Sequence, residues 1–188
     1  MDFTDLVTLR QSVRRYEKRH VENEKLMQCL EAARLAPSAS NSQPWSFIVV
    51  DDPELKDQVA HATYTSMVGF NRFTLHAPVI LVIVMETPKV ITQLGIRIKR
   101  KEWSLMDIGI AAEHFCLQAA ELGLGTCMLG WFREKKVKEL LGIPNTKTVG
   151  LLITVGYPAE DYALRKKKRK PLTAILSFNR YRDPHART

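Results

Sequence analysis

The feature that most constrains the fold is an apolar segment between residues 105 and 122. Its apolar residues recur at helical spacing on one side, and Met106 and Ile110 make the opposite side apolar too. Gly123 and Gly125 follow the segment and end the helix. Because a helix that is apolar nearly all round does not face water, we expect it to be deeply buried or to form a subunit interface.

The remaining apolar patterns predict a mixture of helices and strands. Residues 63–76 are expected to be irregular or weakly helical, and the tail carries a short helical pattern from Leu172 onward. With no internal repeat and no clear linker, the 188 residues suit a single domain, 1–188, of the α+β or α/β class with a central sheet. Helices are expected near residues 3–9, 24–35, 53–62 and 133–141, and strands at 47–50, 79–85, 126–129 and 148–155.

Composition excludes several classes of protein. No apolar run approaches the roughly 20 residues of a membrane helix, and the amino terminus lacks the features of a signal peptide. The three cysteines, Cys29, Cys116 and Cys127, are too widely spaced for a disulfide framework or a zinc site. None of the five histidines forms a metal-binding pair on a helix, so no metal is expected. We therefore expect a cytoplasmic protein with reduced thiols in its core.

The formal net charge of +8 is concentrated in two clusters, residues 97–101 and 165–170. Such runs suit nucleic acid, a membrane surface or small phosphates, although a solvated surface is the default interpretation. Nucleic acid is the less favoured partner because aromatic residues are not interleaved with the basic ones and no nucleic-acid motif is present. The glycines between 123 and 130 do not match a dinucleotide fingerprint, since they precede a strand rather than open a helix.

The segment Arg10-Gln11-Ser12-Val13-Arg14 is the first candidate site. In an extended chain, residues at i, i+2 and i+4 share a face, so Arg10, Ser12 and Arg14 would converge. Two guanidinium groups and a hydroxyl suit an organic phosphate, because arginine makes bidentate charge-assisted hydrogen bonds. The basic run from Lys166 to Lys170 would complete such a site. The alternative is an exposed basic turn.

The second candidate is the stretch "APSASNSQPWSFIVV", residues 36–50, in which small polar residues directly precede a hydrophobic strand. Amides and hydroxyls at this place, beside Trp45 and Phe47, suit a flat heteroaromatic ring with polar edges. The alternative is a capped loop with no ligand. The polar side chains concerned are Ser38, Ser40, Asn41 and Gln43.

These pieces together resemble the FMN-dependent nitroreductases. The resemblance implies an α+β fold with a central, mostly antiparallel sheet flanked by helices. It also implies an intertwined homodimer with two FMN sites at the subunit interface. The matching segments are "RQSVR", "APSASNSQPWSFIVV", "DIGIAAEHFCLQAAELGLGTCMLGWF", "TVGLLITVGYP" and "KRKPLTAILSFNRY", in the family's order and over most of the chain.

The resemblance also assigns roles to individual residues. It implies that the first segment contacts the FMN phosphate and the N1–O2 edge of the flavin, through Arg10, Gln11, Ser12 and Arg14. The loop that reaches the flavin from the other subunit would comprise Pro37, Ser38, Ser40, Asn41 and Gln43. Leu129 and Gly130 would form the backbone turn facing the ring near N5, and Lys167 and Arg169 would lie at the phosphate. A further flavin contact is expected near residues 70–73, with Asn71 as a candidate.

The function implied is an FMN-dependent NAD(P)H oxidoreductase that reduces a small-molecule acceptor, nitroaromatic or quinone-like, by ping-pong hydride transfer through flavin N5. The cofactor performs that chemistry, so no catalytic side chain is expected. Arg14 would stabilise negative charge on the reduced flavin. Dehalogenation, dehydrogenation or flavin sensing on the same fold stay open as alternatives, as does a basic nucleic-acid-binding module.

Overall fold

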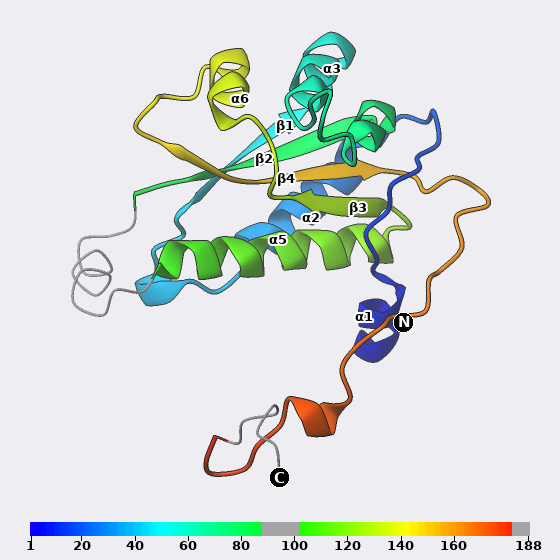
Figure 1. Ribbon diagram of the computed structural model, residues 1–188, viewed down its shortest axis with the longest axis vertical. Coiled ribbons are helices and arrows are strands. Elements are labelled where there is room, and N and C mark those ends of the chain that lie inside the picture. The colour runs from blue at the N-terminus through cyan, green and yellow to red at the C-terminus, as the bar shows by residue number, and fades with distance from the viewer. Residues whose placement is uncertain (88–101, 182–188) are drawn as a thin grey trace.

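A four-stranded antiparallel sheet forms the centre of the computed structural model, which describes residues 1–87 and 102–181 (Figure 1). The strands are β1 (Trp45–Val50), β2 (Val79–Met85), β3 (Gly125–Leu129) and β4 (Thr148–Gly156), in the order β1-β2-β4-β3. Each neighbouring pair is antiparallel, which confirms the predicted α+β class. The predicted basic cluster at 97–101 lies outside the described residues.

Helices cover both faces of the sheet. Helices α2 (Asn23–Arg34) and α5 (Trp103–Glu121) lie on one face, and α3 (Pro53–His61) and α6 (Glu134–Leu141) lie on the other (Figure 1). Alternate residues of β2 therefore enter two cores: Leu81 packs with the α2–α5 layer and Ile80 with the α3–α6 layer. This double covering explains why β2 is a continuous apolar run.

Helix α5 has one face buried in the core and an opposite apolar face that is exposed in this chain. Its inner residues Ile108, Ala112 and Phe115 are buried in the core, as predicted for a central helix. On the outer face, Leu105 is 50% exposed and Met106 is 63% exposed. The predicted burial of this helix is confirmed for its inner face, and the predicted subunit interface stays a prediction.

The remaining elements follow local sequence signals. Asp52 caps α3 by accepting a hydrogen bond from the N–H of Leu55, and Gly142 ends α6 in the left-handed region at a φ of 66°. Strand β1 begins at Trp45 rather than at the expected residue 47, because the ladder with β2 continues to the pair Trp45–Met85. The short elements are α1 (Phe3–Leu9) and the 3₁₀ turns η1 (Ala39–Asn41), η2 (Arg72–His76) and η3 (Leu172–Ala174).

The three cysteines are free and buried, as predicted. Burial raises the pKa of the Cys29 thiol to about 12, so this thiol is protonated at neutral pH. No helix within residues 1–87 and 102–181 is long and apolar enough to span a bilayer.

Segment 10–14 is fixed against β3 by a close backbone approach. The N–H of Val13 donates to the carbonyl of Thr126 at 2.8 Å, and Ser12 pairs with Thr126 as a parallel bridge. Gly125 makes this approach possible, because a Cβ at that position would lie 2.6 Å from Cγ2 of the buried Val13. The position of segment 10–14 therefore depends on the absence of a side chain at residue 125.

Substituting Gly125→Ala should lower the free energy of unfolding by about 1–3 kcal/mol, because the new methyl group overpacks against Val13. Urea denaturation measures this change. Gly69→Ala is the matched control, since its Cβ would meet only ordinary contacts with Arg72 at 3.5 Å, and it should stay within about 0.5 kcal/mol of the parent. Equal stability of the Gly125 variant and the parent would contradict the close approach.

Candidate functional site

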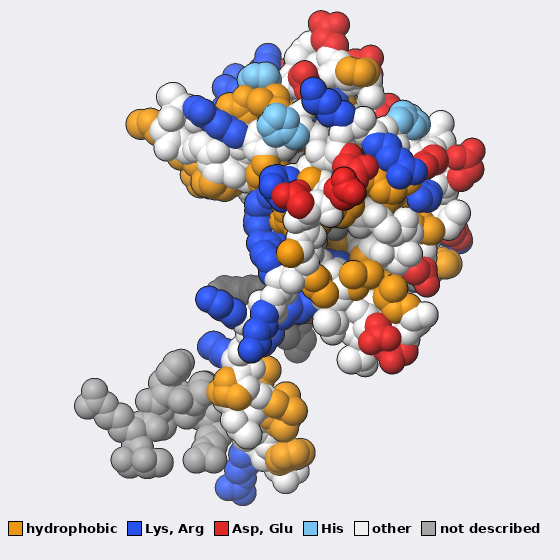
Figure 2. Space-filling model, turned by 90° about the vertical axis from the view of Figure 1, so that its right-hand side faces the viewer, with side chains coloured by type: hydrophobic (Ala, Val, Ile, Leu, Met, Phe, Trp, Pro, Cys, Tyr) orange, Lys and Arg blue, Asp and Glu red, His pale blue; other side chains and the backbone are white. Residues whose placement is uncertain are grey.

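A basic cavity of ≈ 500 Å³ lies between segment 10–14 and residues 165–169. These residues belong to the carboxyl-terminal tail, which here means the described residues 157–181 that follow β4. Figure 2 shows Lys and Arg side chains gathered along this tail where it leaves the body of the protein. The structure thus brings together residues that are more than 150 positions apart in the sequence. Six of the predicted cofactor-binding residues line the cavity, namely Arg10, Gln11, Ser12, Arg14, Lys167 and Arg169, and Arg165, Lys166 and Lys168 line it as well.

Several hydrogen bonds hold the tail against segment 10–14, and Gln11 and Tyr162 each make more than one of them. The amide of Gln11 donates to the carbonyl of Ala163 at 3.3 Å and accepts from the N–H of Arg165 at 3.1 Å. The hydroxyl of Tyr162 donates to the carbonyl of Ser12 and accepts from the N–H of Arg14, both at 3.2 Å. Gln11 therefore holds the tail in register beside the arginines.

The charges around the cavity are only partly neutralised by the protein itself. Arg10 forms an ion pair with Glu113 of α5, with Nη2 and Oε1 2.9 Å apart. The ammonium of Lys167 donates to the carbonyl of Arg10. Burial, reinforced by the neighbouring charges of Arg10 and Arg169, lowers the pKa of Lys167. An anion placed in the cavity would relieve this repulsion.

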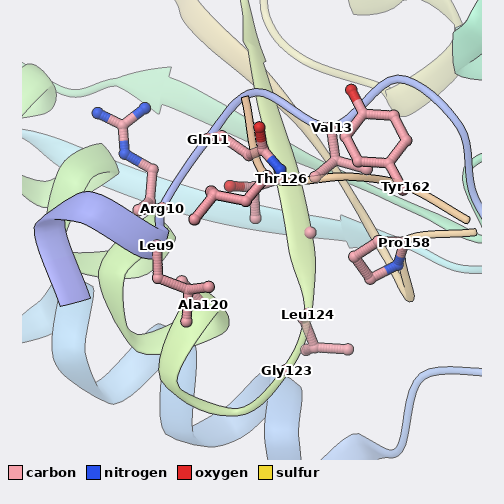
Figure 3. A pocket seen from close by; sticks show the side chains of 12 residues that line it. Leu9, Arg10, Gln11, Val13, Ala120, Gly123, Leu124, Thr126, Pro158 and Tyr162 are labelled. Carbon is pink, nitrogen blue, oxygen red and sulfur yellow. The ribbon is translucent and has the colours of Figure 1, made fainter. Parts of the chain in front are cut away.

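A mainly apolar pocket of ≈ 160 Å³ also borders this segment (Figure 3). Leu9, Ala120 and Leu124 line it, together with Tyr162 from the tail. In Figure 3 the guanidinium of Arg10 points away from these apolar side chains. Segment 10–14 therefore borders both the apolar pocket and the basic cavity, with Arg10 and Gln11 lining both.

The loop from Pro37 to Gln43 has a strained backbone. Ser40, Asn41 and Gln43 all have positive φ, at 53°, 50° and 49°, which is rare for residues other than glycine. Each such residue costs about 1–3 kcal/mol and persists only where its surroundings enforce it, as at functional sites. The side chains of these three residues are exposed. The predicted ring-contacting loop is thus a rigid turn that presents polar groups to its surroundings.

Two kinds of hydrogen bond enforce this conformation. Within the loop, the N–H of Gln43 donates to Oγ of Ser38 at 2.9 Å. From outside it, the N–H of Ala39 donates to both carboxylate oxygens of Asp107, each at 3.2 Å. Asp107 is buried in the second turn of α5, so the loop is anchored to the central helix.

The predicted backbone turn at Leu129 and Gly130 lies at the end of β3. Leu129 is buried, whereas Gly130 is exposed and has no atom within 4 Å of an ideal Cβ position. The buried Asn71 lies next to this turn, because its amide donates to the carbonyl of Trp131 at 3.1 Å. The backbone at Gly130 is therefore open to a ligand.

The structure does not bring the loop to the basic cavity of the same chain. The loop lies at the amino-terminal end of α5, and α1 with segment 10–14 lies toward the opposite end (Figure 1). Within one chain, the two halves of the predicted cofactor site are therefore separate.

Several residues of the site were not found from the sequence. Glu113 and Tyr162 carry no local signal, because their contacts with Arg10 and Ser12 arise only from tertiary structure. The basic run identified Arg165 only as a cation, yet its guanidinium donates to the carbonyl of Ser12. Among residues 1–87 and 102–181, no group of three His, Cys, Asp or Glu side chains is arranged to hold a metal ion.

The relatives of this chain cover most of its length. It is 34% identical over 160 residues to an Archaeoglobus fulgidus protein named as an NADH dehydrogenase/NAD(P)H nitroreductase. The aligned region covers 83% of this chain and 85% of that protein. An iodotyrosine deiodinase of Thermotoga neapolitana is 29% identical, over 94% of this chain and 97% of its own length. The structure of an FMN-dependent nitroreductase from Clostridium difficile has a TM-score of 0.77 and 29% identity, and it covers 95% of this chain and 100% of that one.

The family model matches a region that contains the sheet, segment 10–14, the strained loop and the Gly130 turn. This match, described as the nitroreductase family, runs from residue 7 to residue 157. The fold and the sequence therefore agree, and the chain is an oxidoreductase of the nitroreductase family.

Proposed function

We propose that this protein is an FMN-dependent NAD(P)H oxidoreductase that reduces nitroaromatic or quinone-like acceptors in a ping-pong cycle. The observation that carries the proposal is the basic cavity, in which Arg10, Ser12 and Arg14 meet Lys167 and Arg169. A phosphomonoester has a charge of about −1.5 to −2 at neutral pH, and guanidinium groups bind its oxygens in a bidentate manner. The chemistry of these donors fits the phosphate of FMN.

The other predicted residues fit the ring of the same cofactor. The Gly130 backbone is accessible, so it can approach a flat ring without a side chain in between. The strained loop presents the amides and hydroxyls that would pair with the polar edge of a flavin. Because the loop and the cavity lie apart in one chain, the proposal requires that the loop serves the cofactor held by a second chain.

The role of the protein would be to bind and orient the cofactor, and to stabilise charge beside it. When bound, FMN would supply the chemistry of accepting a hydride from NAD(P)H and passing reducing equivalents to the acceptor. Arg14 lies 5.8 Å from the centroid of the Phe73 ring, and this contact orients its guanidinium. A fixed positive charge at the N1–O2 edge would favour the negative charge that accompanies reduction.

The apolar surface of the chain supports a homodimer. Leu105, Met106 and Ile110 are exposed on α5, and Phe3 on α1 is 72% exposed. In the tail, Phe178 is 80% exposed. Monomeric proteins rarely leave such apolar groups in water. A second copy of the chain would bury them and would also supply the missing loop.

Reductive dehalogenation is the second candidate function. It is favoured by the relative from Thermotoga neapolitana, which is named an iodotyrosine deiodinase and matches 94% of this chain. Anaerobic turnover of a panel of nitroaromatics, quinones and iodotyrosine by the reduced protein distinguishes the two. Iodide release faster than the reduction of every other acceptor would replace the nitroreductase proposal with dehalogenation.

Arg14→Ala and Lys167→Ala should each weaken FMN binding by about ten- to a hundredfold, as expected from the loss of a charge-assisted partner worth about 1.5–3 kcal/mol. Quenching of flavin fluorescence measures the dissociation constant. Arg15→Ala is the matched control, because Arg15 is adjacent but pairs with Asp161 outside the cavity, and it should change the constant by less than about threefold. If both cavity variants hold FMN as tightly as the control, the phosphate assignment is wrong.

The native protein should sediment as a dimer at micromolar concentration. Ile110→Glu should dissociate it, because a carboxylate would be buried without a partner in the apolar interface. The variant should lose FMN at the same time, since each site would lack the loop of the other chain. A monomeric variant that keeps FMN with parental affinity would refute the shared site.

Two inactive variants should restore activity when they are combined in one dimer. One chain carries Arg10→Ala with Arg14→Ala, and the other carries Ser40→Trp, which blocks the ring. A heterodimer would have one site with both lesions and one with neither, so its activity should return to about half of the parental level. Subunit exchange is verified separately with tagged chains. No recovery in verified heterodimers would mean that the loop and the arginines serve the same flavin from one chain.

A further inference from the structure

The basic run in the tail contains lysines that the proposed FMN site does not use. Arg165 and Lys167 turn toward segment 10–14, where they donate to the carbonyls of Ser12 and Arg10. Lys166 and Lys168 lie between and beside them in the sequence and line the same cavity. Both are exposed, and within the described residues neither forms a hydrogen bond or an ion pair through its side chain. These two ammonium groups are therefore free to bind an exchangeable anion.

The charge of the cavity exceeds what one phosphate neutralises. Within the described part of the chain, seven cationic side chains line the cavity, and Glu113 pairs with one of them, Arg10. A phosphomonoester contributes close to two negative charges, so about four positive charges would remain after FMN binds. Like charges that line one cavity repel one another. A second anionic group in the same cavity is therefore favourable.

The two types of cation suit different ligands. Arg10 and Arg165 have their guanidinium groups held by Glu113 and by a backbone carbonyl, so they are already oriented for a resident group. Lys166 and Lys168 are flexible point charges without such partners, which suits a ligand that arrives and leaves in each catalytic cycle. The cavity would thus offer one set of cations to a resident phosphate and another set to a phosphate that exchanges.

We propose that Lys166 and Lys168 form a second phosphate subsite beside that of FMN and that it takes the 2′-phosphate of NADPH. This inference rests on the proposed function, because the donor has to reach the ring of a cofactor whose phosphate lies in this cavity. The 2′-phosphate is the one anionic group that distinguishes NADPH from NADH. The subsite therefore makes NADPH the preferred electron donor.

The direct test is a binding experiment on the FMN-loaded protein. Adenosine 2′,5′-bisphosphate should bind about tenfold more tightly than adenosine 5′-monophosphate at low ionic strength, and calorimetric titration measures both constants. Lys166→Gln with Lys168→Gln should abolish the preference. Lys135→Gln with Lys136→Gln removes the same charge from the exposed surface of α6, outside the cavity, and should keep it.

Kinetics provide a second readout of the same subsite. In the Lys166→Gln/Lys168→Gln variant, the ratio of the KM for NADPH to the KM for NADH should rise about tenfold, which corresponds to about 1.4 kcal/mol. The parental preference for NADPH should also fall as salt rises from 0.01 to 0.5 M, because exposed charges are screened at high ionic strength. The Lys135→Gln/Lys136→Gln variant should show the parental ratio.

Other outcomes would overturn the inference in distinguishable ways. If inorganic phosphate binds as tightly as the bisphosphate, the lysines hold a free anion and not the donor. If the bisphosphate displaces FMN, there is one phosphate site and not two. Binding of single-stranded DNA that is lost in the lysine variant, with no preference for the bisphosphate, would assign the lysines to nucleic acid. A parent that holds no FMN, seen from its visible absorbance before any titration, would refute the proposed function and the subsite with it.

Discussion

The packing of α5 against the sheet is the interaction on which the rest of the site depends. Ile108, Ala112 and Phe115 bury one face of this helix in the core, so its position and rotation are fixed. Two acidic residues on the same helix then hold the two parts of the site. Asp107 accepts from the backbone of the strained loop, and Glu113 pairs with Arg10 at the basic cavity. A shift of α5 would move both parts together.

The basic cavity combines structural rigidity with unfavourable charge. Its walls are held by Tyr162 and Gln11, which bond segment 10–14 to the tail through backbone groups. Burial, together with repulsion from the neighbouring cations, lowers the pKa of Lys167. An anionic ligand offsets that repulsion, so ligand binding and stability of the tail should be coupled. By the same reasoning, a cavity lined by seven cationic side chains would favour more than one anionic group.

The strained loop shows how a site stores conformational energy. Three residues with positive φ within four positions are unfavourable by several kcal/mol in total, on the order of 1–3 kcal/mol each. Helix α2 ends just before the loop at Arg34, β1 begins just after it at Trp45, and Asp107 fixes its middle. The loop is therefore held in one conformation, which would lower the entropic cost of binding a rigid ligand there.

The sequence by itself determined the local elements and the chemical character of the site. Hydrophobic periodicity located α5 and β2 because burial repeats with the helix or strand period. The Arg-x-Ser-x-Arg spacing predicted that Arg10, Ser12 and Arg14 converge, because alternate residues of an extended segment share a face, and all three line the basic cavity. Only the tertiary structure decided that Glu113 pairs with Arg10, that Gly125 admits Val13, and that the loop lies away from the arginines of its own chain. The two contacts join residues about a hundred positions apart, and no local pattern encodes them or the position of the loop. They depend on how the helices pack on the sheet, which is set by the shape of the whole core.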